Sequence, residues 1–236
     1  HIYNSCSVFQ DGEVLAHYRK QSLPNYSVFD EERYFTRGKD ASVFAINGVR
    51  IGLNICEDVW SSAPMASNRS AGAECVIAIN GSPYEIGSQI NRESQLRKRV
   101  EEVRIPVIYV NMVGGQDELV FDGRSMLMNG QGECTKPGPL CEESSLLAVF
   151  HPADGSLEAR DLAKAAGDPG EEVYRILVCG LRDYVRKNGF SDVVFGLSGG
   201  IDSGLTLAVA VDALGSAHVH TVMMPSRHTS SLSLDL

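Results

Sequence analysis

Hydrophobic and polar positions follow two different periods along the first 150 residues. Residues 42–46 and 49–54 are apolar runs joined by Asn47-Gly48, a dipeptide that favours a two-residue hairpin turn. Residues 74–80 (ECVIAIN) are apolar almost throughout, which is typical of a strand buried on both faces. These runs therefore predict three strands.

A longer segment, residues 85–104, carries apolar residues at helical spacing among Arg, Lys and Glu. The pattern predicts an amphipathic helix that Pro106 ends. The apolar residues of this helix are Ile86, Ile90, Leu96, Val100 and Val103. Further strands are expected at residues 106–113, 125–128 and 145–150. Strands and helices in this succession imply a layered α/β domain.

The apolar rhythm stops in residues 151–170, which gather Gly, Pro and Asp and predict a linker. A new unit follows, with expected elements at 171–188 (helix), 192–197 (strand), 201–214 (helix) and 218–224 (strand). This is a βαβ unit, for which a right-handed crossover is expected. We therefore divide the chain into a domain at 1–150, a linker and the start of a second domain at 171–236.

Composition narrows the class of protein. The 236 residues, 43% of them hydrophobic, suffice for one domain and part of another. A net charge of −9 argues against nucleic acid as a partner, because phosphate binding needs a basic surface. Neither a run of about 18 apolar residues nor a secretory leader is recognisable, so a cytoplasmic protein without membrane contact is predicted.

The six cysteines show no CxxC pair and no histidine at metal-ligand spacing. They are Cys6, Cys56, Cys75, Cys134, Cys141 and Cys179. Reduced thiols are expected, and five of the six are interpreted as small buried hydrophobes. Cys134 and Cys141 flank a Pro/Gly loop, which leaves a disulfide or a shared metal open for this pair.

Both ends of the sequence are expected to be incomplete. The chain starts without Met, inside an apparent strand, and a single βαβ unit is too small to bury its sheet. For the same reason, residues 1–236 alone are expected to be inactive.

Two short motifs carry candidate chemistry. Lys20 begins KQSLPNY, and Cys56 lies in NICEDVW, where an expected strand ends. A Cys at a strand end has its thiol exposed on a sharp turn, as a nucleophile requires. A nearby ammonium favours the thiolate and stabilises an oxyanion. Taken singly, a solvated Lys and a structural Cys are the commoner interpretations; together the motifs favour catalysis.

The stretches KQSLPNYSVFDEERYF, ICEDVW, NGSPY and PVIYVNMVGGQDELVFDG resemble the nitrilase superfamily, and more closely the glutaminase domain of glutamine-dependent NAD synthetases. The resemblance covers almost all of residues 1–150 and implies a nitrilase-like α-β-β-α sandwich that lacks its N-terminal part. It implies that Cys56 forms a thioester with glutamine and releases ammonia, with Lys20 as the catalytic lysine. Tyr26 and Ser82 fall at positions that bind the glutamine.

The carboxylates fit the resemblance less completely. Glu31 resembles the residue that orients the lysine, with Glu32 as the adjacent alternative. The family's general-base Glu would lie before the first residue, and neither Asp11 nor Glu13, in an expected hairpin turn, is assigned that role. Ser88 occupies a glutamine-binding position where relatives often carry Lys, which leaves the detail of glutamine binding open.

A second motif, FGLSGGIDS, follows an apolar run and opens an expected helix. Successive glycines let backbone N–H groups approach a phosphate, and a helix N-terminus adds partial positive charge. The motif is neither a Walker A loop nor a dinucleotide fingerprint. It resembles the pyrophosphate loop of N-type ATP pyrophosphatases, whose domain is Rossmann-like. The continuation ALGSAHVHTVMMPSRHTSS is similar to the NAD synthetase branch, although His228 replaces a Tyr that is frequent there.

By this resemblance Asp202 is a Mg²⁺ ligand, and a carboxylate oxygen suits that ion. An acid complementing the helix dipole is the structural interpretation of the same residue. The residues implied to bind ATP are Gly196, Leu197, Ser198, Gly199, Gly200, Ile201, Asp202 and Ser203.

The implied activity is a glutamine-hydrolysing NAD synthase, with glutamine, ATP and deamido-NAD as substrates, Mg²⁺ as cofactor and a homo-oligomer as the expected assembly. ATP would adenylate the nicotinate carboxylate, which ammonia then attacks, releasing AMP and pyrophosphate. Two alternatives stay open: another amidotransferase joining the same domain types, and an inactive chain that serves as a binding module.

Overall fold

The computed structural model describes residues 1–135, 137–160, 168–225 and 227. The chain divides into two compact units. The N-terminal unit comprises His1–Met112, Gly123–Pro139 and Glu143–Ala165. The C-terminal unit comprises Val113–Asp122, Leu140–Glu142 and Ala166–Leu236. Two short segments inside the expected first domain thus group with the C-terminal unit, which the sequence did not predict. No helix in the described part of the chain has the length and apolar character needed to cross a membrane.

A five-stranded sheet organises the N-terminal unit, in the order β3-β4-β5-β6-β9. The strands are β3 (Val43–Ile46), β4 (Val49–Ile55), β5 (Cys75–Asn80), β6 (Val107–Asn111) and β9 (Met126–Met128). The central strands β4, β5 and β6 are parallel, while β3 and β9 pair antiparallel at the edges. Each was expected from its apolar run, with bounds that differ by one or two residues.

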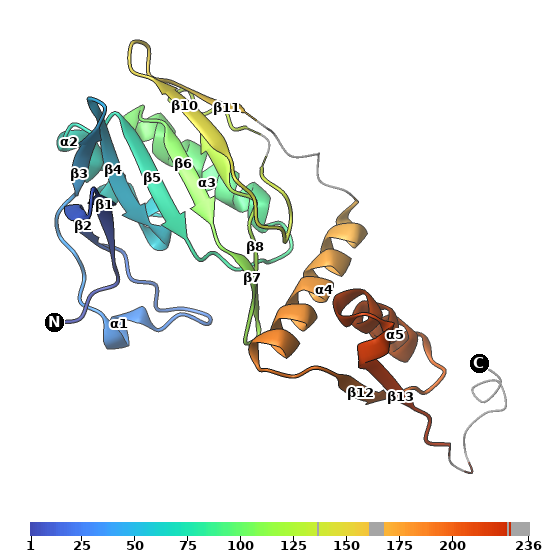
Figure 1. Ribbon diagram of the computed structural model, residues 1–236. Helices are drawn as coiled ribbons and strands as arrows, with labels where there is room; N and C mark the ends of the chain where they lie inside the picture. Colours follow the sequence, from blue (N-terminus) through green and yellow to red (C-terminus); the bar gives the residue numbers. More distant parts are fainter. Residues whose placement is uncertain (136, 161–167, 226, 228–236) are drawn as a thin grey trace. The chain divides into compact units, whose positions relative to one another are not determined.

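Helices α2 (Ser62–Ser70) and α3 (Ser88–Val103) cover one face of this sheet (Figure 1). Leu96, Val100 and Val103 of α3 enter the core as predicted. The expectation was wrong for Ile86 and Ile90, which are 84% and 74% exposed. Their inward places are taken by polar residues, among them Arg92, which is 3% exposed. Arg92 is buried because its guanidinium hydrogen-bonds to Ser82 and Pro83 in a neighbouring loop.

The opposite face of the sheet is covered in part by a hairpin of β1 (Ser5–Gln10) and β2 (Glu13–Arg19). Its core contains Tyr18, Phe44, Leu53 and Ile55. Ile79 of β5 remains 39% exposed, so the expectation that this strand is buried on both faces was wrong. The α/β class is confirmed, and the described residues form one helix-covered layer of the expected sandwich.

A second hairpin joins β10 (Leu147–His151) to β11 (Ser156–Arg160). The turn Asp154-Gly155 closes it, with Gly155 at φ +69°. Residues 156–160 were expected to belong to an irregular linker, and that expectation was wrong. The Gly/Asp signal marked a hairpin turn and not the start of a linker.

The C-terminal unit is built around α4 (Pro169–Lys187), which the strands β7 (Val113–Gln116) and β8 (Leu119–Asp122) contact. Asp183 of α4 accepts a 2.8 Å hydrogen bond from the Gly115 N–H, and Lys187 Nζ donates to the Gly115 carbonyl at 2.6 Å. These charge-assisted bonds fix the hairpin to the helix.

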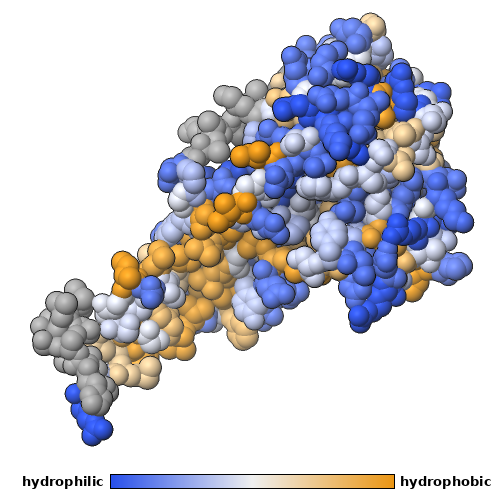
Figure 2. Space-filling view, turned by 180° about the vertical axis from the view of Figure 1, so that it is seen from behind, coloured by the Kyte–Doolittle hydropathy of each residue, from blue (hydrophilic) through white to orange (hydrophobic). Residues whose placement is uncertain are grey.

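The predicted βαβ unit is present as β12 (Val193–Gly196), α5 (Ile201–Leu214) and β13 (Val219–Val222), with parallel strands. Apolar side chains gather on the visible face of the C-terminal unit (Figure 2). Val194, Ile201 and Met224 are 69%, 86% and 74% exposed. This exposure agrees with the expectation that one βαβ unit does not bury its own sheet.

Candidate active site

The candidate catalytic residues lie where the parallel strands β4 and β5 end. Parallel strands bring their carboxyl ends to the same edge of a sheet, where α/β proteins place their sites. Cys56 follows β4 directly, and Ser82 lies two residues after β5. Asn111, the last residue of β6, accepts the Ser82 N–H at 2.9 Å, so the strand ends are joined at this edge.

Cys56 begins the short 3₁₀ helix Cys56–Val59, at the sharp turn that directly follows β4. Its φ of +45° is unusual for a non-glycine residue and is typical of strained functional positions. Burial raises the pKa of the Cys56 thiol, while the Lys20 ammonium and a backbone hydrogen bond from Gly81 lower it. The thiol therefore has two nearby groups that favour its charged form.

Lys20 is 1% exposed and its ammonium is 2.7 Å from Oε1 of Glu31. A buried charge needs such a partner, because an unpaired ammonium would be strongly destabilised. Asn4 Nδ2 donates to the other Glu31 oxygen at 3.3 Å. Glu32, the alternative partner, pairs with Arg37 instead. Of the two acidic residues, Glu31 is the one that contacts the lysine.

Tyr26 and Glu57 lie beside this pair. The Tyr26 hydroxyl donates a 2.9 Å hydrogen bond to Glu57 Oε2. Burial raises the pKa of the Glu57 carboxyl, and the bonds from Tyr26 and the Lys20 charge lower it. Burial and the Glu57 contact both raise the pKa of Tyr26. Glu57 was not among the residues selected from the sequence, because an acid after a Cys has no distinctive pattern.

A cavity of about 290 Å³ opens next to Cys56. This is the size of a small ligand pocket. Tyr26, Ser82 and Ser88 all border it, so the three expected glutamine-binding residues share one cavity. Its lining is completed by Phe29, Glu57, Trp60, Pro83, Glu85, Asn91 and Arg92.

Arg92 holds the loop that carries Ser82. Its guanidinium donates to the Ser82 hydroxyl at 3.0 Å, to the Ser82 carbonyl at 2.9 Å and to the Pro83 carbonyl at 2.8 Å. The planar array of donors in Arg suits such a cluster of acceptors. No sequence pattern indicates this role, because an Arg in an amphipathic helix is normally solvated.

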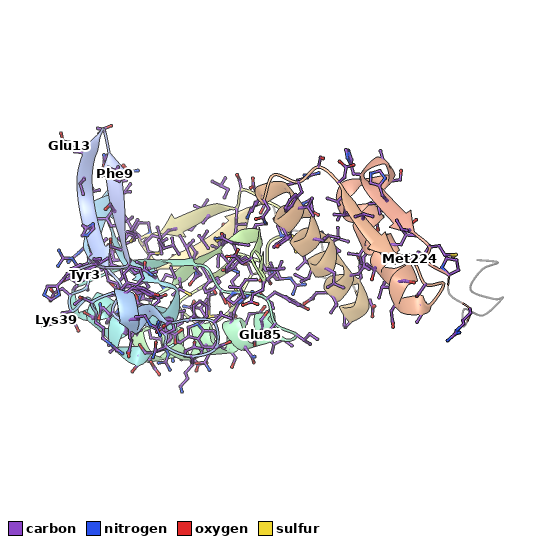
Figure 3. All side chains as sticks on the ribbon, turned by 90° about the horizontal axis from the view of Figure 1, so that it is seen from below. Tyr3, Phe9, Glu13, Lys39, Glu85 and Met224 are labelled. Carbon is purple, nitrogen blue, oxygen red and sulfur yellow. The ribbon has the colours of Figure 1, made fainter. Side chains whose placement is uncertain are left out.

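Glu13, one of two acids preceding Lys20, is exposed at the start of β2. Figure 3 shows it at the outer end of the β1–β2 hairpin, far from Glu85 at the cavity. Asp11 lies in the turn itself with φ +52°. Neither acid borders the cavity next to Cys56.

The glycine-rich loop connects β12 to α5. The Ser203 hydroxyl donates to the Gly200 carbonyl at 2.9 Å and lies 3.1 Å from the Ser198 hydroxyl. Gly199 has φ +75°, a conformation that glycine adopts without strain. Gly196, Ser198, Gly200 and their helix-opening neighbour Ile201 are exposed, so the backbone at the N-terminus of α5 is open to a ligand.

Asp202 is exposed in the first turn of α5. Among the described residues, no group of three or more His, Cys, Asp or Glu is arranged to hold a metal. A single carboxylate beside a phosphate-binding loop nevertheless fits Mg²⁺, which takes one or two protein carboxylates and completes its shell with phosphates and water.

Cys134 and Cys141 do not pair, contrary to one of the possibilities left open. They belong to different units, and the Cys134 thiol contacts Met126 Sδ at 3.5 Å. The Cys141 thiol hydrogen-bonds to Cys179 of α4 and lowers the pKa of the Cys179 thiol. Sequence spacing did not predict this contact, because the two cysteines lie in segments with different periodicity.

Comparison with known proteins identifies two family matches. The family described as Carbon-nitrogen hydrolase matches residues 1–149, and the family described as NAD synthase matches residues 173–235. Similar proteins include the glutamine-dependent NAD(+) synthetases of Acinetobacter baylyi, 43% identical over 235 residues, and Xylella fastidiosa strain 9a5c, 44% identical over 238 residues. The alignments cover 100% of this chain but only 43% and 44% of those relatives, so the chain spans less than half of their length.

Solved structures give the same result. The glutamine-dependent NAD+ synthetase of Acinetobacter baumannii, determined in complex with adenosine diphosphate, superposes with a TM-score of 0.92 at 42% identity. That match covers 99% of this chain and 44% of the other. A carbon-nitrogen hydrolase from Helicobacter pylori G27 has a TM-score of 0.54 at 25% identity, covering 60% of this chain and 54% of the other.

Proposed function

The chain belongs to the carbon-nitrogen hydrolase family, and on that premise we propose that it hydrolyses glutamine and supplies the ammonia for ATP-dependent synthesis of NAD from deamido-NAD. The observation that carries the proposal is the buried Lys20–Glu31 ion pair acting on the Cys56 thiol beside a cavity. Similarity to glutamine-dependent NAD(+) synthetases over the whole chain supports the coupling to NAD synthesis.

In the proposed reaction the Cys56 thiolate attacks the side-chain amide carbon of glutamine. The C–N bond breaks, ammonia leaves, and a thioester joins the substrate to Cys56. Water then hydrolyses the thioester to glutamate and restores the thiol. Lys20 favours the thiolate and offers positive charge to the oxyanion of each tetrahedral intermediate. Glu31 orients Lys20 through their 2.7 Å contact.

The cavity lining suits an amino acid substrate. Tyr26 presents an aromatic face and Ser82 a hydroxyl, and we assign both to glutamine binding. Ser88, the first residue of α3, borders the same space. Glu57 adds a carboxylate that an α-ammonium group would favour. The base that takes the thiol proton is not assigned to any residue of this chain.

The second half of the reaction is assigned to the glycine-rich loop. Residues 196–203 would bind the phosphates of ATP through backbone N–H groups and the hydroxyls of Ser198 and Ser203. Asp202 would hold Mg²⁺, which when bound neutralises phosphate charge. The nucleotide in the Acinetobacter baumannii complex supports a nucleotide site in such proteins. AMP, pyrophosphate, glutamate and NAD would be the products.

Three further assignments belong to the proposal. We place the division between a glutaminase domain and a synthetase domain within residues 151–170, between the two family matches. We also assign the enzyme to the cytoplasm, where its substrates occur, and expect a homo-oligomer. The alternatives to this assignment are a different amidotransferase and an inactive binding module, and the following experiment tests the assignment against them.

The test uses Cys56→Ala in the full-length protein. Glutamine-dependent NAD formation should be abolished, while synthesis from free ammonia should continue, because ammonia bypasses the thioester. Cys134→Ala, which removes another half-buried thiol, is the matched control and should retain both activities. Unchanged glutamine-dependent NAD formation in Cys56→Ala would exclude Cys56 as the nucleophile. Absence of ammonia release from glutamine by the unaltered protein would favour the inactive binding module.

A further inference from the structure

One buried carboxylate links the two candidate catalytic segments without bordering the cavity. Asp58 is 0% exposed and accepts four hydrogen bonds, two on each oxygen. Oδ1 accepts the backbone N–H groups of Gln21 at 3.1 Å and Ser22 at 2.8 Å. Oδ2 accepts the Ile55 N–H at 2.9 Å and the Tyr18 hydroxyl at 2.8 Å.

These partners flank the catalytic residues in the sequence. Gln21 and Ser22 directly follow Lys20, and Ile55 directly precedes Cys56. The Lys20 backbone is also held by Asn4 and Gly38, but neither of those bonds reaches the cysteine turn. The Asp58 carboxylate therefore hydrogen-bonds both to the residues that follow Lys20 (Gln21 and Ser22, the lysine segment) and to the residue that precedes Cys56 (Ile55, in the cysteine turn).

The same residue closes the turn in which Cys56 is strained. The bond from the Ile55 N–H to Asp58 spans Cys56, whose φ of +45° is a strained conformation that persists only where its surroundings impose it. Loss of this bond would let the turn relax and would move the thiol away from the Lys20 ammonium.

The chemistry of the site requires a carboxylate and not an amide. Three backbone N–H groups and one hydroxyl converge on the side chain, and each oxygen of an ionised Asp accepts two bonds. An Asn in its place would direct an NH₂ group at backbone donors, at either the lysine segment or the cysteine turn. A buried N–H group that loses its acceptor destabilises the segment that carries it. Burial raises the pKa of the Asp58 carboxyl, while each of its four hydrogen bonds acts in the opposite direction and favours the charged form.

We propose that Asp58 is a positioning residue for glutamine hydrolysis: its carboxylate fixes the register between the Lys20 ammonium and the Cys56 thiol while contacting neither substrate nor reacting atoms. The inference rests on the proposed glutaminase function. A residue that only stabilised the fold would lower the amount of active protein without changing the properties of the thiol.

The experiment compares Asp58→Asn with the unaltered full-length protein. Its kcat for glutamine hydrolysis should fall about 100-fold, because a misplacement of about 1 Å has that effect, while KM changes little. The pH midpoint for alkylation of Cys56 by iodoacetamide, followed by mass spectrometry of its peptide, should rise, since the ammonium no longer faces the thiol. Ammonia-dependent synthesis should be unchanged.

Asn68→Ala is the matched control. Asn68 is 1% exposed and bridges α2 to β4 through Leu53 and Asn54, away from the lysine segment. It should lower stability without moving the alkylation midpoint. Tyr18→Phe removes one of the four hydrogen bonds to Asp58 and keeps the carboxylate. Its kcat for glutamine hydrolysis should fall by about tenfold or less, and its alkylation midpoint should rise by less than that of Asp58→Asn.

An unmoved alkylation midpoint in a folded Asp58→Asn protein, or a kcat no lower than that of Asn68→Ala, would overturn the proposal. If Asp58→Asn does not fold, an unchanged midpoint and kcat in Tyr18→Phe would overturn it. Absence of glutaminase activity in the unaltered protein would instead refute the proposed function, and the alkylation midpoints would still decide whether Asp58 positions the thiol.

Discussion

The hydroxyl of Tyr26 lies 2.9 Å from Oε2 of Glu57, although the Tyr26 side chain is half exposed and 31 positions away in the sequence. The bond joins the LPNY segment to the turn that carries Cys56. Phe29 packs edge-on against the Tyr26 ring, with ring centroids 6.2 Å apart. These two contacts hold one wall of the cavity in place.

Replacing Tyr26 by Phe should weaken glutamine binding. The variant keeps the aromatic face but releases Glu57, and it loses a hydrogen bond to a charged group. We expect KM for glutamine to rise about tenfold, the lower end for such a bond, with a small change in kcat. Steady-state ammonia release measures both. Tyr34→Phe, at an exposed ring outside the cavity, should change neither, and equal KM values in both variants would contradict the assignment.

Removing the Lys20 charge should raise the pKa of the Cys56 thiol. Burial already raises it and the ammonium lowers it, so Lys20→Met removes the opposing influence. The thiolate fraction at neutral pH then falls, and the alkylation midpoint should move upward by about 1–3 pH units. Lys39→Met, at an exposed lysine, is the matched control.

Lys20→Met also leaves Glu31 without its cation, which destabilises a partly buried site. The double variant Lys20→Met/Glu31→Gln removes both charges and should still show a midpoint above that of the unaltered protein. A midpoint that stays in place in both variants would show that Lys20 does not act on the thiol.

Gly115→Ala should destabilise the C-terminal unit. A Cβ at this position would lie 3.0 Å from the Gly180 Cα and 3.2 Å from its carbonyl oxygen, so strand and helix backbones would have to separate. Overpacking of this kind costs about 1–3 kcal/mol. Chemical denaturation measures the difference. Gly204→Ala, where the added methyl meets no atom within 4 Å, should be neutral or stabilising.

Much of the fold followed from local periodicity. Helix α5 was predicted with its observed bounds, because Gly200 precedes and Gly215 follows a mostly apolar segment. The hairpin at Asn47-Gly48 was predicted equally well, since its turn has a specific dipeptide. What periodicity could not give was the grouping of β7 and β8 with α4, because that contact joins residues about 68 positions apart.

Only those residues of the candidate site that lie in recognisable motifs could be selected from the sequence. The motifs selected Cys56 and Lys20 as candidates, and the fold brings the Lys20 ammonium near enough to lower the pKa of the Cys56 thiol. Asp58 and Arg92 escaped selection for a physical reason: their partners are mainly backbone groups, which every residue carries and which therefore leave no pattern in the sequence. Such residues become visible only when the hydrogen bonds of a buried polar group are followed one by one.

The assignment of Asp202 to ATP leads to a final prediction, on a site separate from the thiol chemistry. Asp202→Asn keeps the helix opening and its size but removes the charge offered to Mg²⁺, so NAD formation should fall at least about tenfold with glutamine and with ammonia alike. Asp212→Asn, at an exposed acid in the last turn of the same helix that accepts a bond from Tyr174, should leave both rates near those of the unaltered protein. Parallel assays with each nitrogen source at varied Mg²⁺ measure the effect, and excess Mg²⁺ should restore part of the loss. A decrease confined to the glutamine-dependent rate would place Asp202 outside the ATP site, because ATP is consumed whichever nitrogen source is used.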